Sequence, residues 1–199
     1  MQDASSYFAT GCLSQGRLIS TTGVQHHMVK RLRRAQPLAG TFATMAELMP
    51  GDVALGQAGD QLKTLLGSCV AVILTDPRRT VGVMCHIVHV GQPNAANTDN
   101  TAFGAVAMKE MFARLRAVGI TPQRCEAYVF GGGNMFPSMF RAKHVGDSNV
   151  DWVLDFLESE KIHVVDHCLG GNGYRKVSWT VGVGDPLVET VFAEQGVTP

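Results

Sequence analysis

Residues 69–90 read CVAVILTDPRRTVGVMCHIVHV, two apolar runs joined by a polar turn. The runs 69–74 and 81–90 are rich in β-branched side chains, which are typical of strands. Asp76 and Pro77 lie between them, where such residues favour a chain reversal. Because successive residues in each run are apolar, both faces of each strand are expected to be covered. This stretch therefore predicts a hairpin inside a layered domain.

Shorter runs on either side complete the predicted sheet. Six of them have the composition of strands: 52–55, 61–66, 124–130, 162–166, 177–183 and 187–192. Residues 45–49 are expected to form one helical turn, because Pro50 and Gly51 follow them. The fold class that we predict is α+β: a single domain with a β-sandwich or a curved, mostly antiparallel sheet, flanked by helices.

Two segments have the apolar spacing of amphipathic helices. The first is 101–118, and Gly119 is placed to end it. The second is 149–161, for which Ser148 or Asn149 is the candidate N-cap. Both helices are expected to cover a face of the sheet.

Composition excludes several classes of protein. The chain has 199 residues, 45% of them apolar, and its 17 basic side chains balance 17 acidic ones. A zero net charge disfavours nucleic-acid binding, since proteins that bind phosphates carry a basic excess. No apolar run approaches the roughly 20 residues that a bilayer-spanning helix needs, and residues 1–10 lack the pattern of a secretory signal. We therefore expect a cytoplasmic protein without membrane insertion.

The cysteines agree with a reducing compartment. Five are scattered along the chain without a CxxC pair: Cys12, Cys69, Cys85, Cys125 and Cys168. An odd number of isolated thiols is not the pattern of a disulfide scaffold. Each thiol is therefore expected to be free.

The first 44 residues differ from the rest of the chain. They contain two histidines and a basic run: His26, His27, Lys30, Arg31, Arg33 and Arg34. Apolar periodicity is poor before residue 45 and regular after it. We expect residues 1–44 to be an N-terminal arm, either peripheral or with a docking role, and residues 45–199 to be the functional domain.

The predicted hairpin brings a thiol and an imidazole together. With the loop at 76–79, Cys69 lies opposite His86, and the Cβ atoms of such a pair are roughly 4.5–5.5 Å apart. A neighbouring imidazole can take the proton of a thiol, which becomes a nucleophile, and can then return a proton to the leaving group. Gly67 and Ser68 leave the backbone open to a substrate, and N–H groups near the thiol are candidates for an oxyanion hole.

Two other interpretations of this pair remain open. Cys69 and His86 could be core residues without a catalytic role, and a register shift of one residue would put them on opposite faces. The chain also offers six soft ligands for a zinc site: Cys69, Cys85, His86, His89, His167 and Cys168. Cys85 and His86 alternate across their strand, however, and no CxxC or HxxxH motif frames them, so no metal is expected.

The sequence around the pair resembles a known family. Residues 64–72, TLLGSCVAV, followed by 82–86, GVMCH, are similar to the signature of the CheD family of chemoreceptor glutamine deamidases. Further similar segments follow in the family's order: 100–102 (NTA), 130–136 (FGGGNMF), 145–149 (VGDSN), Asp166, 170–173 (GGNG) and 175–177 (RKV). The resemblance covers about residues 50–185, and its specific part is the LGSC block with a histidine seventeen residues after the cysteine.

The resemblance implies a protein-glutamine glutaminase that acts on chemoreceptors in chemotaxis. Cys69 would attack the carboxamide of a receptor glutamine and form a thioester, and His86 would be the general base and acid. No cofactor is implied. A CheC-like phosphatase is the second partner that the family implies, and the implied fold is a cysteine-hydrolase-like β-sandwich with flanking helices. The alternative function is a catalytically weak binding module of the chemotaxis array.

The third catalytic position departs from the family pattern. The family's threonine lies six residues before the cysteine, where this chain has Lys63, and Thr64 is the candidate third member. In an unbroken strand Thr64 would face away from Cys69, unless a β-bulge near Gly67 restored its direction. The glycine turn 131–133 is expected either to line the site or only to end a strand.

Overall fold

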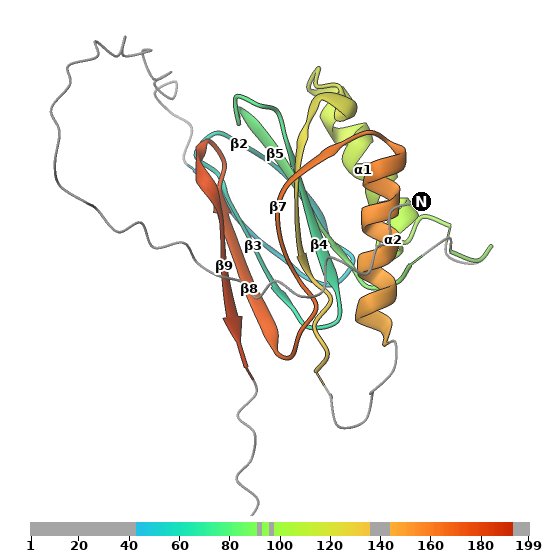
Figure 1. The fold of residues 1–199 in the computed structure, drawn as a ribbon. Coiled ribbons are helices and arrows are strands. Elements are labelled where there is room, and N and C mark those ends of the chain that lie inside the picture. Colours follow the sequence, from blue (N-terminus) through green and yellow to red (C-terminus); the bar gives the residue numbers. More distant parts are fainter. Residues whose placement is uncertain (1–42, 91–92, 96–97, 136–143, 193–199) are drawn as a thin grey trace, which may run out of the picture.

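A computed structural model describes residues 43–90, 93–95, 98–135 and 144–192. These residues form two sheets packed face to face, with two helices outside one sheet (Figure 1). The five-stranded sheet has the order β2 (Val53–Gln57), β5 (Val81–Ile87), β4 (Val70–Thr75), β6 (Glu126–Gly131) and β7 (His163–Leu169). The four-stranded sheet has the order β1 (Met45–Leu48), β3 (Gln61–Leu66), β8 (Tyr174–Thr180) and β9 (Val183–Val191). The helices are α1 (Gly104–Ala117) and α2 (Val145–Ser159), and a short 3₁₀ helix, η2, spans Pro122–Arg124.

Strand β4 is buried along its whole length because layers cover both of its faces. Val70, Val72 and Leu74 belong to the core under the helices. Ala71 and Ile73 belong to the core between the two sheets. Strand pairing is antiparallel except in the β1–β3 and β6–β7 pairs. The predicted α+β sandwich flanked by helices is therefore confirmed.

Both predicted helices exist, with different first residues. Helix α2 begins at Val145 because His144 caps it: the His144 Nδ1 accepts from the Gly146 N–H (2.9 Å), and the Asp147 carboxylate accepts from the His144 N–H (3.0 Å). Helix α1 begins three residues later than predicted, at Gly104. Among the described residues, no helix is long and apolar enough to cross a membrane.

The helical turn predicted at 45–49 is wrong, since these residues contain strand β1. Leu48 pairs with Thr64 in a parallel register, and its side chain is buried between the sheets. An isolated helical turn has few hydrogen bonds to stabilise it. The edge of the four-stranded sheet offers the same backbone groups a row of partners.

The predicted register of β4 and β5 is also wrong, by two residues. Ala71, and not Cys69, lies opposite His86. A shift by an even number of residues keeps every side chain on its face. Cys69 packs against the core between the sheets, the face to which His86 also points. The thiol and the imidazole therefore share a face but are diagonal to each other.

The loop between β4 and β5 explains the shift. Thr75 pairs with Gly82, so six residues separate the last pair of the hairpin. The Asp76 carboxylate accepts from the backbone N–H groups of Thr80 (2.7 Å) and Val81 (3.0 Å). These bonds stabilise the longer loop, because they satisfy backbone donors that a shorter loop would have placed in the strand ladder.

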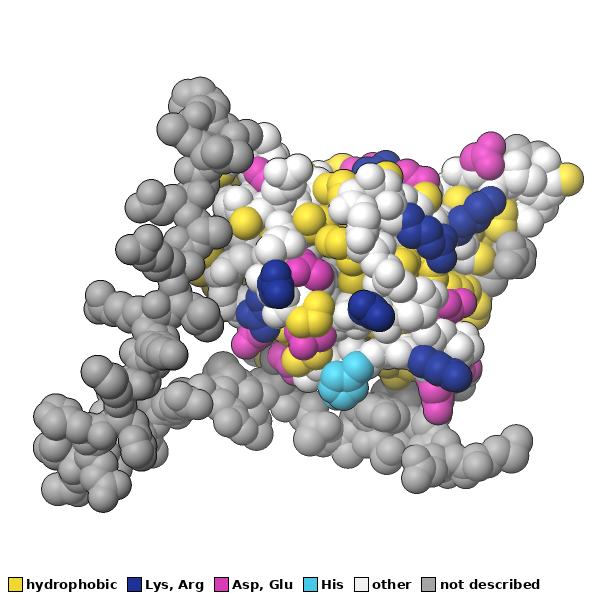
Figure 2. Space-filling view, turned by 90° about the horizontal axis from the view of Figure 1, so that it is seen from above, with side chains coloured by type: hydrophobic (Ala, Val, Ile, Leu, Met, Phe, Trp, Pro, Cys, Tyr) yellow, Lys and Arg dark blue, Asp and Glu magenta, His cyan; other side chains and the backbone are white. Residues whose placement is uncertain are grey.

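An ion pair joins this loop to Asp185, near the start of β9. The Arg79 guanidinium donates to the Asp185 carboxylate (2.5 Å) and to the Tyr128 hydroxyl (2.7 Å), and Tyr128 donates in turn to Asp185 (2.9 Å). Figure 2 shows this end of the sandwich, where charged side chains of both signs are interspersed with apolar ones.

The predicted N-terminal arm lies outside the described residues apart from Ala43 and Thr44. The Thr44 N–H and hydroxyl donate to the Asp60 carboxylate (2.7 and 2.8 Å), directly before β1 begins. The division of the chain into an arm and a domain stays a prediction.

Candidate active site

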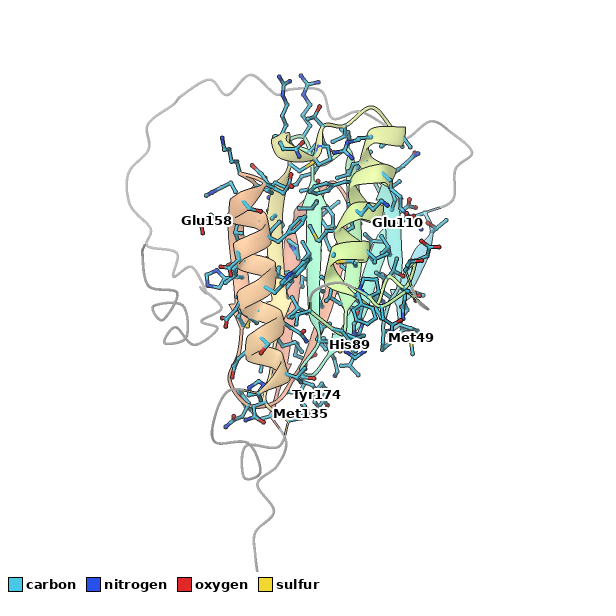
Figure 3. The ribbon with its side chains drawn as sticks, turned by 90° about the vertical axis from the view of Figure 1, so that its right-hand side faces the viewer. Met49, His89, Glu110, Met135, Glu158 and Tyr174 are labelled. Carbon is cyan, nitrogen blue, oxygen red and sulfur yellow. The ribbon has the colours of Figure 1, made fainter. Side chains whose placement is uncertain are left out.

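The candidate nucleophile lies where the chain crosses from one sheet to the other. Strand β3 ends at Leu66 in the four-stranded sheet, and β4 begins at Val70 in the five-stranded sheet. Cys69 is in the short connection between them and is partly exposed at the rim of the inter-sheet core. Figure 3 shows the side chains of Met135 and Tyr174 toward the end of the sandwich where α2 begins. Met135 borders the crossing, since a Cβ on Gly67 would lie 3.1 Å from its Cγ.

His86 is held by a hydroxyl from the other sheet. Its Nδ1 lies 2.8 Å from the Thr64 Oγ1, and the Thr64 hydroxyl donates to the Leu48 carbonyl (2.9 Å). A hydroxyl has one hydrogen, so the Thr64 oxygen must accept from His86. Nδ1 of the neutral ring therefore carries the proton, and Nε2 is the basic nitrogen.

The basic nitrogen has no competing partner. Nε2 of His86 is buried and makes no hydrogen bond within the described part of the chain. Burial lowers the pKa of His86 below its usual value, although the Leu48 carbonyl and the Asp52 charge oppose the shift. The imidazole is therefore neutral at pH 7 and can accept a proton.

The thiol starts in its protonated form. Burial raises the pKa of Cys69, and its own backbone N–H, which faces the sulfur, partly offsets this effect. A raised thiol pKa beside a lowered imidazole pKa means that the two groups are neutral at rest. The thiol needs a base at the moment of attack, and the free Nε2 is chemically suited to that role.

Thr64 contacts His86 without the predicted bulge. Thr64 is 4% exposed and points from β3 into the space between the sheets. The expectation that it faces away from Cys69 applies only to a strand that is unbroken between the two residues. The crossing at 67–69 breaks that strand, so alternation along β3 does not determine which way a β4 side chain points. The structure thus brings together Thr64, His86 and the face on which Cys69 lies.

The glycine turn 131–133 ends β6 and donates hydrogen bonds to the segment 67–69, which contains the nucleophile. The Gly132 N–H donates to the Cys69 carbonyl (2.9 Å), and the Gly133 N–H donates to the Gly67 carbonyl (2.8 Å). Gly131 has a φ of +119°, and a Cβ there would lie 2.1 Å from the Cys69 carbonyl oxygen. Only glycine allows this approach.

The predicted backbone contacts at Gly67 and Ser68 have a more specific arrangement than expected. The carbonyls of both residues are bound within the protein: the Gly133 N–H donates to the first, and the Asn149 side chain donates to the second (3.1 Å). One group available to an oxyanion is the N–H of Cys69, which donates to no backbone carbonyl among the described residues and lowers the pKa of its own thiol.

Two residues of this region were not predicted from the sequence as part of the site. Asn149 was considered only as a helix cap, yet it reaches the backbone before Cys69. Arg175 is 4% exposed and donates to the Gly170 carbonyl and, at 3.3 Å, to the Cys168 sulfur. A charged residue in an alternating strand is the only local signal that could have marked Arg175.

The candidate zinc ligands lie on different faces. Cys85 points to the core under the helices, as the alternation along its strand predicted, and burial raises the pKa of its thiol to about 12. His86 points to the opposite side. Within the described residues, no three His, Cys, Asp or Glu side chains gather closely enough to hold a metal ion.

A groove of about 550 Å³ lies elsewhere, on the four-stranded sheet. Ten residues from β1, β3, β8 and β9 line it: Glu47, Lys63, Thr64, Leu65, Lys176, Val177, Ser178, Leu187, Val188 and Glu189. Neither Cys69 nor His86 is among them. Thr64 lines this groove and also contacts His86 in the candidate site.

Comparisons with known proteins identify the family of the chain. The family described as "CheD chemotactic sensory transduction" matches residues 89–190. The probable chemoreceptor glutamine deamidase CheD 2 of Albidiferax ferrireducens is 36% identical over 69% of this chain and 82% of its own length. The probable chemoreceptor glutamine deamidases of Pseudomonas savastanoi pv. phaseolicola and Dechloromonas aromatica are 32% and 33% identical to this chain, over 81% and 82% of their own lengths. A Neisseria meningitidis protein of solved structure, NMB0706, is similar with a TM-score of 0.40 and 12% identity, over 65% of this chain and 64% of that one.

Proposed function

The chain belongs to the CheD family, and we propose that it is a chemoreceptor glutamine deamidase. It hydrolyses the side-chain carboxamide of receptor glutamines to a carboxylate and releases ammonia. The observation that carries the proposal is the buried Nε2 of His86, which has no partner among the described residues and lies on the face where the partly exposed Cys69 thiol lies. The names of the similar proteins support the substrate.

The first half of the reaction forms a thioester. The Cys69 sulfur attacks the carboxamide carbon while Nε2 of His86 takes the thiol proton. The carbonyl oxygen becomes an oxyanion, which the Cys69 N–H stabilises. The C–N bond breaks, and the imidazolium returns the proton to the nitrogen, so that ammonia leaves.

The second half of the reaction releases the product. Water attacks the thioester carbon, and Nε2 takes one of its protons. The C–S bond breaks, the sulfur regains the proton from the imidazolium, and glutamate remains on the receptor. One water is consumed and one ammonia is produced, and the enzyme returns to its starting protonation state.

Thr64 acts through His86 and is a positioning residue. Because its oxygen accepts from Nδ1, it holds the ring in the tautomer in which Nε2 is basic. The alternative function, a catalytically weak array-binding module, depends on Lys63 at the position of the family's threonine. The contact between Thr64 and His86 supplies the hydroxyl from the next position and favours the enzyme.

We also propose the cellular setting that the family resemblance implies. The enzyme works in the cytoplasm, where the signalling regions of chemoreceptors are accessible, and a CheC-like phosphatase regulates it. Residues 45–199 form the deamidase domain, and residues 1–44 form an arm that catalysis does not need.

Incubation with a cytoplasmic receptor fragment, followed by peptide mass spectrometry, tests the function. Specific glutamines should become glutamates, and the Cys69→Ala variant should leave them unchanged. Free glutamine should be a poor substrate, because it lacks the contacts remote from the reacting amide that a receptor supplies. Absence of conversion with a panel of receptors, or efficient turnover of free glutamine, contradicts the proposal.

A further inference from the structure

We infer that Asn149 is a positioning residue that aims the backbone N–H of Cys69 at the reacting carbonyl oxygen. This inference deepens the proposed function and rests on it. Asn149 lies in the second turn of α2 and is completely buried. It takes no part in the reaction as described above, and its amide hydrogens bond to neither the thiol nor the imidazole.

Both hydrogens of the Asn149 amide are used on the backbone of the site. Nδ2 donates to the Ser68 carbonyl (3.1 Å) and to the Val88 carbonyl (3.1 Å). Ser68 directly precedes the nucleophile Cys69. Val88 directly follows β5, the strand that carries His86. One side chain therefore fixes the distance between the segment that carries Cys69 and the strand that carries His86.

The bond to Ser68 determines the direction of the next N–H. In a trans peptide, the carbonyl and the N–H of one unit point in opposite directions. Asn149 holds the Ser68 carbonyl toward α2, so the Cys69 N–H of the same unit points away from α2. That N–H faces the Cys69 sulfur, where the oxyanion forms after attack. Without Asn149, nothing else described holds the Ser68 carbonyl, so the peptide unit between Ser68 and Cys69 can rotate and its N–H no longer has a fixed direction.

The helix that carries Asn149 is itself fixed against the glycine turn. A Cβ on Gly132 would lie 2.3 Å from the Val150 Cγ2, and a Cβ on Gly146 would lie 2.7 Å from the Gly132 carbonyl oxygen. Gly132 in turn holds the Cys69 carbonyl. The peptide units on both sides of Cys69 are therefore anchored to α2, one through Asn149 and one through the glycine turn.

The amide oxygen of Asn149 reduces the stability of the folded protein. Oδ1 is buried and makes no hydrogen bond within the described part of the chain. A buried polar atom without a partner destabilises a fold. The amide cannot be reversed to satisfy it, because Oδ1 would then face two carbonyl oxygens. Asn149 therefore has one destabilising atom, Oδ1, and its Nδ2 donates two hydrogen bonds to the backbone of the site.

The test combines kinetics with alkylation of Cys69 in the full chain. In Asn149→Ala, kcat on the receptor fragment should fall roughly tenfold or more, because one oxyanion donor is misaligned. KM should change less than about threefold, since the N–H acts in the transition state. The pH dependence of iodoacetamide alkylation, followed on the Cys69 peptide, should move upward by roughly half a unit or more, because the thiolate loses a hydrogen bond.

Val153→Ala is the matched control. Val153 is buried one turn further along α2, so its truncation costs stability without touching the site. Assays are run well below the melting temperature of each variant. If Asn149→Ala does not fold, Asn149→Thr replaces it, since a hydroxyl has only one hydrogen for the two carbonyls.

The inference stands only if kcat falls, the alkylation profile shifts, and Val153→Ala shows neither change. With an active wild type, any other combination overturns it. Alkylation needs no receptor, so the two proposals fail separately. If the wild type leaves receptor glutamines unchanged, the proposed function is wrong, and the alkylation profile alone decides the role of Asn149.

Discussion

The Thr64 hydroxyl lies 2.8 Å from Nδ1 of His86, across the space between the two sheets. Its single hydrogen points to the Leu48 carbonyl, so the bond to His86 defines which ring nitrogen is basic. The Thr64 hydroxyl on the four-stranded sheet thus determines which nitrogen of His86, on the five-stranded sheet, carries the proton.

Replacing Thr64 tests this relationship. Thr64→Val keeps the shape but removes the acceptor for Nδ1, so kcat on the receptor fragment should fall roughly 10- to 100-fold. Thr64→Ser retains the hydroxyl and should keep most of the activity. Equal activity of the valine and serine variants would show that the hydroxyl does not orient the ring.

The nucleophile assignment predicts a clear order among cysteine variants. Cys69→Ala should reduce deamidation to background, and Cys69→Ser should be nearly as inactive, because a serine hydroxyl is far harder to ionise than a thiol. Cys85→Ser, on the helix side of the sheet, should remain active apart from a packing cost. Mass spectrometry of receptor peptides measures all three. Normal turnover by Cys69→Ser, or inactivity of Cys85→Ser alone, would contradict the assignment.

The pH dependence follows from the neutral state of the thiol and the imidazole. Burial lowers the pKa of His86 below 6.5, the usual histidine value. As the pH is lowered, kcat/KM should therefore begin to fall only below pH 6.5, where the ring becomes protonated. His86→Ala should lose roughly 10²- to 10⁴-fold in kcat. Because burial raises the pKa of Cys69, this variant should recover activity only above the ordinary thiol value of about 8.5. An acid limb near pH 7.5 in the wild type would contradict this account.

The ion pair between Arg79 and Asp185 predicts a pH-dependent part of the stability. The hydrogen bonds from Arg79 and Tyr128 lower the pKa of Asp185. A carboxyl with a lowered folded-state pKa stabilises the protein above its unfolded pKa of about 3.9 and loses that contribution as the pH falls through the folded value. Wild type should therefore be more stable than Asp185→Asn at pH 7, and the difference should shrink toward pH 3.

Urea unfolding at several pH values measures this difference. Glu189→Gln is the control, since its pair with Lys176 is longer (3.6 Å) and both side chains are exposed. That variant should stay within about 0.5 kcal/mol of wild type at every pH. A constant gap between wild type and Asp185→Asn from pH 7 to pH 3 would show that the carboxylate charge does not contribute.

Two truncations should separate the arm from the domain. A chain without residues 1–40 should melt cooperatively and remain active, because β1 and the Thr44 contacts to Asp60 are intact. A chain without residues 1–48 should lose activity, because it lacks β1 and the Leu48 carbonyl that orients Thr64. Loss of cooperative melting in the shorter truncation would show that the arm is part of the core.

Local sequence patterns account for both helices and for the alternation along the strands, but not for strand β1. The continuous apolar run of β4 predicts burial on both sides, since any polar side chain there would need a buried partner. Alternation predicts that Cys85 and His86 point to opposite sides, and the structure agrees. The register was missed because a shift of two residues leaves this alternation unchanged, and the side chain of Asp76 decides the loop length.

The sequence by itself determined the layered fold and the opposite directions of Cys85 and His86, because apolar periodicity and alternation are properties of neighbouring residues. Only the tertiary structure decided that Thr64 reaches His86 and that Asn149, 81 residues from Ser68, holds its carbonyl. Both contacts depend on where the chain crosses between sheets and on how α2 packs against them. Hydrogen bonds of this kind form between side chains and backbone that only packing brings within reach, and no pattern along the chain records them.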